Sequence, residues 1–322
     1  MYDYDDIALC DSHVTIVRIG NSISHGFYVN PRYVGYYLHL NESLIEHLGR
    51  GSTNQTELSG KDIGRISIDL PSETSQKKIV EILAAYDKLI ETNNKRIKAL
   101  EQMAENLYKE WFVRFRFPGH ENAKFENGIP KGWEYRTVEA LSSILQRGIS
   151  PEYDEEGLST VISQKCIRQS IMDIGEARKQ SKLFKPELNL IDGDTVICST
   201  GTGTLGRVGQ VYGEYPDTTF DSHVTLVRSK ENFGKHYLFW SLKSMQVWFM
   251  NMGIGSTNQQ ELYRGTIKNA KILIPSESLL SLFESIIEPI HKKITVLNQS
   301  QNNLISQRDL LLPRLMSGKL EV

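Results

Sequence analysis

The chain of 322 residues contains the same unit twice, and this repeat limits its possible folds more than any other feature. The phrase GSTNQ begins at Gly51 and again at Gly255. Upstream, DSHVTIVR from Asp11 corresponds to DSHVTLVR from Asp221, and downstream the strand-like ISIDLPS corresponds to AKILIPS. A repeat length of about 200 residues is too long for a solenoid and indicates a duplicated domain with a connecting helix.

Each copy of the repeat is followed by apolar residues in alternating steps of three and four, the heptad spacing of a coiled coil. We therefore predict a central long helix over 73–114 and a distal long helix over 277–322. Segments of roughly 35 residues at ~1.5 Å each extend beyond any small domain, so the two helices are expected to pair in antiparallel orientation. The predicted helix-pair interface comprises Ile79, Leu83, Tyr86, Ile90, Ile97, Leu100, Leu107, Phe283, Ile287, Ile290, Ile294, Leu297, Leu304 and Leu311.

Three residues interrupt this heptad pattern. Asn93 and Gln301 are polar positions within the seam, where such residues often fix the register of paired helices at a cost in stability. Pro289 lies inside the distal helix and is expected to kink or break it, because proline lacks an N–H donor.

The remaining sequence divides into a linker and two unequal domains. Residues 115–127 are rich in Pro and Gly and predict a linker. A complete domain is expected over 128–276, with strands at 194–199, 207–212 and 223–228. The first copy has far less sequence ahead of its DSHVT phrase, so 1–72 is interpreted as a partial version of that domain. The predicted fold class is α+β.

Composition and charge exclude several classes of protein. The formal net charge of −2 gives no global bias toward nucleic acid, so such binding would need local patches. No apolar run is long enough for a membrane span, and the acidic N-terminus is unlike a secretory signal, which predicts a cytoplasmic protein. The three cysteines, Cys10, Cys166 and Cys198, are widely spaced and support neither a disulfide framework nor a zinc site.

The stretches that resemble catalytic or nucleotide-binding motifs lack the neighbouring secondary structure that such sites need. Gly201, Gly203 and Gly206 have the GxGxxG spacing, but the sequence after them is β-like, whereas a nucleotide-binding turn opens a helix. A hairpin loop that exposes hydroxyls and backbone N–H groups to a phosphate or a base edge fits better. Asp221-Ser222-His223 is interpreted as a turn leading into a strand, not as a hydrolase triad. No HxxxH or HxH pair and no adenine-methyltransferase motif occurs. We expect no catalytic residue and no metal.

The GSTNQ phrase has two interpretations. Its short polar side chains are typical of a tight turn that bonds its own backbone. The same Asn and Gln side chains can also pair with adenine, while Ser and Thr reach phosphates. A basic stretch between Lys165 and Lys185 adds local positive charge, although nearby acidic residues almost balance it.

The whole layout resembles the specificity subunit of type I restriction-modification systems. Four stretches carry the resemblance: SETSQKKIVEILAAYDKLIETNNKRIKALEQMAENLYKEWFVRFRFPG at 72–119, GIPKGWE at 128–134, the GSTNQ repeat, and RDLLLPRLMSGKLEV at 308–322. In that family, two target recognition domains each read half of a bipartite DNA sequence, and two long antiparallel helices separate them. A helix of ~35 residues spans on the order of 50 Å, more than one turn of duplex DNA.

The resemblance implies a non-catalytic DNA reader with defined partners. These are double-stranded DNA, methyltransferase subunits that bind S-adenosylmethionine, and ATP-driven restriction subunits; the chain itself is expected to bind neither cofactor. The alternative is a truncated or partial protein that docks partners through its helices without specific DNA binding. A truncated gene, a recombination cassette and a subunit completed by another chain all fit the short first domain. The resemblance assigns DNA contacts to Ser256, Thr257, Asn258, Gln259, Thr202, Thr204, Arg207, Ser163, Gln164, Lys165 and Arg168.

Overall fold

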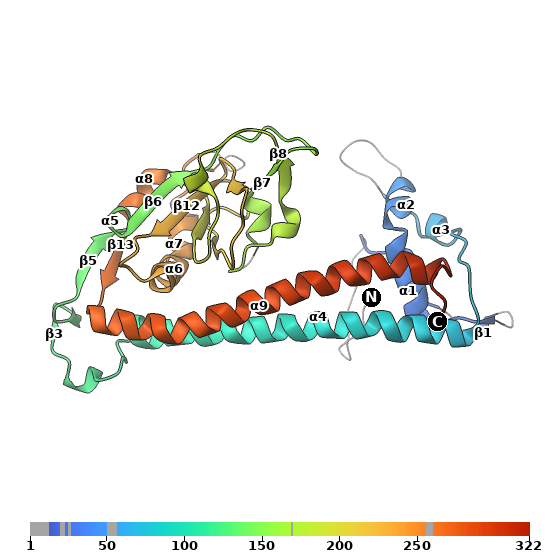
Figure 1. Ribbon diagram of the computed structural model, residues 1–322, viewed down its shortest axis with the longest axis horizontal. Helices are drawn as coiled ribbons and strands as arrows, with labels where there is room; N and C mark the ends of the chain where they lie inside the picture. The colour runs from blue at the N-terminus through green and yellow to red at the C-terminus, as the bar shows by residue number, and fades with distance from the viewer. Residues whose placement is uncertain (1–12, 20–22, 25–26, 50–56, 169, 256–259) are drawn as a thin grey trace. The chain divides into compact units, whose positions relative to one another are not determined.

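The described part of the chain forms two compact units (Figure 1). Unit 1 comprises Met1–Arg96 and Asn298–Val322, and unit 2 comprises Ile97–Leu297. The computed structural model describes residues 13–19, 23–24, 27–49, 57–168, 170–255 and 260–322. Helices and strands are mixed throughout, which confirms the predicted α+β class.

Two long helices each contribute to both units. Helix α4 extends over Glu73–Tyr108 and continues into a π-helical turn at Lys109–Val113, while α9 extends over Glu277–Met316. Pro289 does not break α9, which continues through this residue as one helix. One missing N–H removes a single hydrogen bond, and buried Ile287 and Ile294 hold the helix on either side.

Within unit 1 the helices run antiparallel and share a core with α1 (Pro31–Leu40). Ile79 and Leu83 of α4 meet Leu312 and Leu315 of α9 in this cluster. The tyrosine hydroxyl of Tyr36 on α1 donates to the Asp87 carboxylate, which also accepts a hydrogen bond from Arg308 at 2.9 Å. This network ties three helices together at a polar position.

A buried glutamine connects α4 to the rest of unit 1. Gln76 is 1% exposed, and its amide nitrogen donates to the carbonyls of Tyr28 and Pro71 at 3.0 and 2.9 Å. Its amide oxygen accepts the Asn30 N–H, and the Asn30 side chain in turn caps the first turn of α1. The smaller elements of unit 1 are β1 (Ile23–Ser24), β2 (Phe27–Tyr28), α2 (Glu42–His47) and α3 (Gly60–Ile63).

In unit 2 the same two helices again run antiparallel. Ile97 of α4 packs with Ile294 and Leu297 of α9, and Tyr212 of the globular domain joins this cluster. Further along, the Phe112 ring lies edge-on to Phe283, with ring centroids 5.0 Å apart. Of the residues predicted for the helix pair, the half-buried ones are Tyr86, Ile90, Leu100, Leu107, Ile290, Leu304 and Leu311.

The globular part of unit 2 is built on a four-stranded antiparallel sheet in the order β10-β9-β12-β6. Three of its strands confirm the strands predicted from the sequence. The strands are β6 (Ser142–Arg147), β9 (Thr195–Cys198), β10 (Val208–Gln210) and β12 (Val224–Ser229).

Both faces of this sheet are buried. Along β9, Ile197 packs into a core with α6 (Lys235–Ser244), while Val196 and Cys198 pack into a second core on the opposite face. Successive side chains of a strand point to opposite faces, so a sheet covered on both sides needs nearly continuous apolar residues. Helix α6 is itself buried along most of its length, as expected for a helix enclosed by the first core.

The second core carries a smaller three-stranded sheet in the order β11-β7-β8. Strand β7 pairs parallel with β11 and antiparallel with β8. The bounds of these and the remaining elements are β7 (Ser159–Ile162), β8 (Arg178–Gln180), β11 (Thr218–Phe220), β3 (Phe125–Glu126), β4 (Ile129–Pro130), β5 (Glu134–Thr137), β13 (Lys271–Ile274), α5 (Val138–Leu141), α7 (Gln246–Asn251) and α8 (Arg264–Asn269).

One strand expectation was wrong. The AKILIPS phrase forms β13, which pairs with β5, but the corresponding ISIDLPS phrase of unit 1 forms no strand. A strand requires a partner for its N–H and C=O groups, and no segment among the described residues pairs with 66–72. Separately, no helix formed by the described residues has both the length and the apolar character needed to cross a membrane.

Candidate nucleic-acid interface

The strand directions bring several predicted contact segments to one end of unit 2. Strand β9 ends where its antiparallel neighbour β12 begins, and β6 ends beside the same point, with Arg147 opposite Thr225. Strand β7 ends beside its parallel partner β11 at the Ile162–Phe220 pair. The loops after β7 and β9 and the turn before β12 therefore meet at a single edge.

The glycine-rich loop after β9 is a hairpin connection. It joins the antiparallel strands β9 and β10, and Gly201, Gly203 and Gly206 all adopt positive φ angles of 103°, 75° and 76°. Such angles suit glycine because it has no side chain. The loop opens no helix, so the hairpin interpretation is confirmed and a nucleotide-binding turn is not formed.

Three residues of this loop are predicted DNA contacts: Thr202, Thr204 and Arg207. Thr202 is exposed, whereas Thr204 donates through its hydroxyl to the carbonyl of Thr200 at 3.0 Å. Arg207 is half-buried and donates to the carbonyl of Ile167 at 3.5 Å. Arg207 therefore links this loop to the loop after β7.

The loop after β7 contains the other predicted contacts. The Ser163 hydroxyl accepts the Lys165 N–H at 3.2 Å and caps a short 3₁₀ turn. Gln164 lies beside the glycine-rich loop, because a Cβ on Gly201 would come within 3.7 Å of its side-chain amide nitrogen. Lys165 and Arg168 are exposed, and Arg168 forms an ion pair with Glu176 at 2.6 Å.

A fourth segment reaches the same edge. Ile254 and Glu261 exchange two backbone hydrogen bonds of 2.9 Å, and the Leu262 N–H donates to the carbonyl of Ser199 at 2.8 Å. The chain between them includes Ser256, Thr257, Asn258 and Gln259, which lie outside the described residues. Their predicted contacts stay predictions.

The Asp221-Ser222-His223 phrase forms a turn into β12, as predicted. The buried Asp221 carboxylate accepts the His223 N–H at 2.9 Å, and burial raises the pKa of this carboxyl group. The exposed imidazole Nδ1 lies 2.6 Å from the Thr200 hydroxyl. Sequence reasoning did not assign a site role to His223 or Thr200, although the repetition of DSHVT in both copies was a signal.

Arg147 is a further residue that the sequence did not single out. Its guanidinium donates to the carbonyl of Ser222 at 2.9 Å and forms an ion pair with Glu261. Arg147 therefore connects the turn before β12 to the segment that ends at Glu261.

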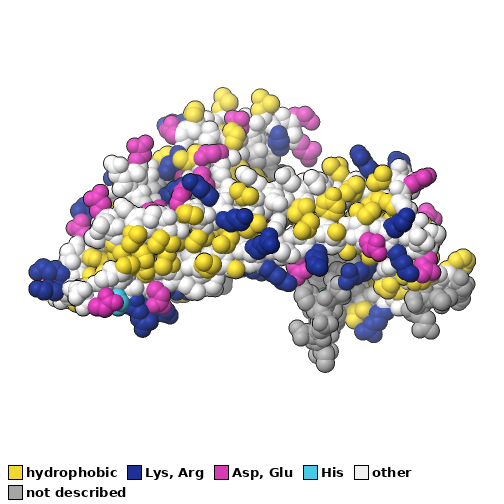
Figure 2. All heavy atoms as spheres, turned by 60° about the horizontal axis from the view of Figure 1, so that its bottom comes forward, with side chains coloured by type: hydrophobic (Ala, Val, Ile, Leu, Met, Phe, Trp, Pro, Cys, Tyr) yellow, Lys and Arg dark blue, Asp and Glu magenta, His cyan; other side chains and the backbone are white. Residues whose placement is uncertain are grey.

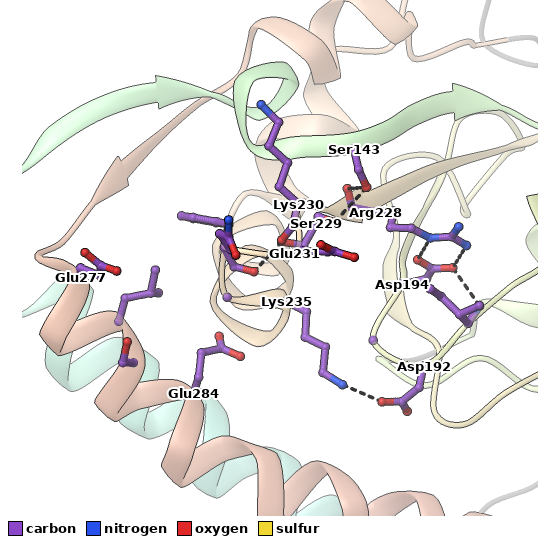
Figure 3. A pocket seen from close by; sticks show the side chains of 17 residues that line it. Ser143, Asp192, Asp194, Arg228, Ser229, Lys230, Glu231, Lys235, Glu277 and Glu284 are labelled. Atoms are coloured by element: carbon purple, nitrogen blue, oxygen red, sulfur yellow. Dashed lines mark hydrogen bonds and ion pairs between the residues drawn. The ribbon is translucent and has the colours of Figure 1, made fainter. Parts of the chain in front are cut away.

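A pocket of about 930 Å³ lies elsewhere in unit 2, between the start of α9 and the loops around β12 (Figure 3). Four of its eight charged side chains form two ion pairs within the lining. Arg228 pairs with Asp194 at 2.7 Å, and Lys235 pairs with Asp192 at 2.7 Å. Glu284 of α9 accepts the Tyr237 N–H at 2.7 Å and so caps the first turn of α6.

A histidine–carboxylate network extends from this pocket along α9. His236 contacts Glu288 at 2.9 Å, and His291 contacts Asp192 at 2.7 Å. Burial alone would raise the pKa of Asp192, but hydrogen bonds from His291 and Lys235 outweigh it and hold this pKa well below its usual range. Burial lowers the pKa of His236 to about 4 and raises that of Glu284 to about 7.

No group of three or more His, Cys, Asp or Glu side chains among the described residues is arranged to hold a metal ion. Cys166 and Cys198 are free and buried, and burial raises their thiol pKa values to about 11 and about 12. These thiols are therefore protonated near neutral pH and pack as small apolar groups.

Comparison with known proteins identifies relatives of the entire layout. Residues 19–102 match the family model described as the type I restriction modification DNA specificity domain. The type I restriction enzyme MjaIX specificity subunit of Methanocaldococcus jannaschii is 28% identical over 302 residues, covering 89% of this chain and 68% of the relative. The HindI specificity subunit of Haemophilus influenzae is 22% identical, covering 82% of this chain and 71% of the relative.

A solved structure agrees at the level of the fold. The crystal structure of a type I restriction-modification S subunit from M. genitalium superimposes with a TM-score of 0.54 at 17% identity, covering 89% of this chain and 72% of the other. The sequence matches and the common fold agree: over most of its length the chain is similar to type I restriction-modification specificity subunits.

Proposed function

We propose that this chain is the DNA-reading specificity subunit of a type I restriction-modification complex and directs its methyltransferase and restriction subunits to a bipartite target. The observation that carries the proposal is the convergence of four segments at one edge of unit 2, in a chain similar to type I specificity subunits. The two loops and the turn supply hydroxyl, amide and basic groups there.

These groups suit the two kinds of contact that a DNA reader needs. Exposed Lys165, Arg168 and Thr202 are suited to phosphates, which position a protein on the duplex. Gln164 and Arg207 offer side chains of the types that pair with adenine and guanine in the major groove. The Arg168–Glu176 pair must open before its guanidinium can bind a phosphate bidentately.

In this proposal the chain catalyses nothing itself. The glycine-rich loop joins two strands, so it lacks the helix N-terminus that holds a pyrophosphate in nucleotide-binding domains. Methyl transfer and ATP-driven cleavage, with S-adenosylmethionine and ATP as cofactors, are assigned to partner subunits. Because its substrate is intracellular DNA, the complex is proposed to act in the cytoplasm.

The long helices are proposed to dock these partners. Several of their large apolar side chains remain exposed, including Leu89 and Leu310 in unit 1 and Met103 and Val296 in unit 2. Figure 2 shows hydrophobic patches, interspersed with charged residues, on the face turned toward the viewer. Surfaces of this kind mark protein interaction sites.

A binding experiment tests the DNA-reading role. The full chain is co-expressed with a type I methyltransferase subunit, and the affinity of the complex for duplex DNA is measured over a range of salt concentrations. The Lys165→Ala, Arg168→Ala double variant is expected to bind at least tenfold more weakly, with the salt slope reduced by about 1 for each lost phosphate contact.

A matched control separates local from general effects of charge. Lys131→Ala removes a 60% exposed lysine that pairs with Glu126 at the β3–β4 hairpin, and it should leave both affinity and salt slope unchanged. If the complex forms but the double variant binds like wild type, the interface lies elsewhere. A complex that binds no duplex DNA would favour the alternative, a scaffold that only docks partners.

A further inference from the structure

We propose that His223, positioned by Thr200, binds a DNA backbone phosphate and contributes to affinity but not to the choice of base sequence. The inference rests on the proposed function and adds a specific contact to it. It also gives a role to the repeated DSHVT phrase.

The backbone of His223 is held rigidly. Its N–H donates to the Asp221 carboxylate at 2.9 Å, and its carbonyl accepts the Ser199 N–H at 2.8 Å. A Cβ on Gly148 would lie only 2.0 Å from the carbonyl oxygen of Phe220, so the chain directly after β6 approaches the start of the turn as closely as glycine permits. The imidazole therefore starts from a fixed position.

The side chain is fixed at one nitrogen. Nδ1 lies 2.6 Å from the Thr200 hydroxyl, while the residue as a whole is exposed. When Thr200 donates to Nδ1, the neutral ring carries its hydrogen on Nε2, and a protonated ring also carries a hydrogen there. In both states Nε2 is a donor, which matches a phosphate oxygen.

The nearby charges leave this donor available. Glu261, the carboxylate that reaches this edge from the neighbouring segment, already pairs with Arg147. The Asp221 carboxylate is buried below the turn and accepts the backbone N–H instead. Exposed Lys165 and Thr202 belong to the two loops at the same edge, so a strand of DNA that contacts them also passes the imidazole.

The repeat separates affinity from sequence choice. His13 begins the same HVT phrase in the first copy as His223 in the second. Two recognition segments that read different base sequences still meet the same sugar–phosphate backbone, so side chains common to both suit phosphate contact. Sequence choice is assigned to the loops at 163–168 and 200–207, which are not part of the shared phrase.

The test compares affinity with selectivity. The full chain, in complex with its methyltransferase subunit, is bound to a random-sequence duplex pool, and both the dissociation constant and the selected consensus are determined. For His223→Gln we expect roughly tenfold weaker binding on every sequence, as for loss of one hydrogen bond to a charged group, with the same consensus. Thr200→Val should act in the same direction with a smaller loss, because the ring remains but is no longer oriented.

Controls distinguish this contact from a structural role. His120→Gln changes another partly exposed histidine of unit 2, which bonds the Phe117 carbonyl, and should alter neither quantity. Melting temperatures of all variants identify any loss of fold. If His223→Gln does not fold, Thr200→Val tests the contact, because it leaves the exposed ring unchanged. A consensus relaxed at one position would overturn the inference in favour of base reading, and unchanged affinity in both variants would overturn it outright. If the wild-type complex does not bind the pool, the proposed function itself has failed.

Discussion

Two nearly identical segments of this chain have different structures in its two units. HVTLVR in unit 2 forms most of β12, and Val224, Leu226 and Val227 are all 0% exposed. HVTIVR in unit 1 forms no strand, and Ile16 and Val17 are 52% and 46% exposed. The difference lies in the partners, since β12 is hydrogen-bonded to β9 on one side and β6 on the other.

The comparison shows that apolar alternation gives a segment the capacity to become a strand but not the strand itself. Backbone groups must be paired and apolar side chains covered before the conformation is stable. Unit 1 obtains its core from helix packing around Leu83 and Tyr33, whereas unit 2 obtains its core from a sheet buried on both faces.

The largest expected difference is between the stability costs of substitutions at two equivalent positions, Leu226 and Ile16. Leu226→Ala should cost about 2–5 kcal/mol, because it leaves a cavity in the second core, while Ile16→Ala should cost less than about 0.5 kcal/mol. In urea denaturation, tryptophan fluorescence measures the cost of Leu226→Ala in unit 2, which contains all four tryptophans of the chain, and far-ultraviolet circular dichroism measures the cost of Ile16→Ala in unit 1. A cost for Ile16→Ala close to that of Leu226→Ala would contradict the comparison, because it would mean that the first copy is packed as well.

The second prediction concerns the dependence of unit 1 on the helix pair. Leu83→Ala removes a fully buried side chain from the core shared by α1, α4 and α9, and should destabilise unit 1 by about 2–5 kcal/mol. Far-ultraviolet circular dichroism should register the change as an earlier loss of helix, while the tryptophan transition of unit 2 stays in place. Leu89→Ala, at a position 53% exposed on the same helix, is the control. A tryptophan transition that shifts equally would show that the units unfold together.

The third prediction uses pH to probe the attachment of α9 within unit 2. Burial raises the pKa of Glu284 to about 7, so the stability that its protonated form contributes is complete below about pH 4.5 and is lost as pH rises through 7. The neutral variant Glu284→Gln lacks this loss. Its stability relative to wild type should therefore increase between pH 5 and pH 8. Exposed Glu277→Gln is the control, and a difference independent of pH would contradict the assignment.

Protonation of His236 should destabilise the same network as the pH falls, whereas ionisation of Glu284 destabilises it as the pH rises. Burial lowers the pKa of His236 to about 4, so unfolding takes up a proton as pH falls below about 6.5, and the stability contributed by the neutral ring is lost toward pH 4. In the Glu284→Gln variant this loss is no longer offset by Glu284. The variant's tryptophan transition should therefore move to lower urea between pH 6.5 and pH 4.5.

The smallest expected effect tests the polar link of unit 1. Tyr36→Phe removes the hydroxyl that donates to Asp87, leaves the ring in the core, and should cost about 1 kcal/mol. Tyr37→Phe, whose hydroxyl bonds the Ser67 carbonyl at an exposed site, should cost less. Both are measured by circular dichroism, and equal costs would mean that the Asp87–Arg308 pair gains nothing from the tyrosine.

Local sequence patterns predicted the elements that have pairing partners close in sequence or a strong apolar periodicity. The heptads predicted both long helices, and apolar runs predicted β9, β10 and β12. The same patterns misjudged ISIDLPS, because 66–72 has no strand partner among the described residues. Pro289 does not break α9, because packing on either side of it maintains the helix. Local rules describe what a segment can do, while tertiary contacts decide the outcome.

The candidate site was only partly predictable for a related reason. Individual loops could be proposed from their residue types, but the sequence did not show that loops near Gln164 and Thr202 meet at one edge. The Thr200–His223 pair joins residues 23 positions apart across a turn, and the Arg147–Glu261 pair joins residues 114 positions apart. Such pairs depend on strand order, which residue composition alone does not encode.

The cap that α9 provides to α6 has a consequence for exchanging recognition domains between subunits. A graft joined at the Pro-Ser step before α9 would separate α6 from Glu284, and His236 from Glu288, unless the recipient helix carried the same residues. Functional chimaeras should therefore include the donor sequence through His291. The segment to exchange is therefore the globular part of unit 2 together with the first four turns of α9.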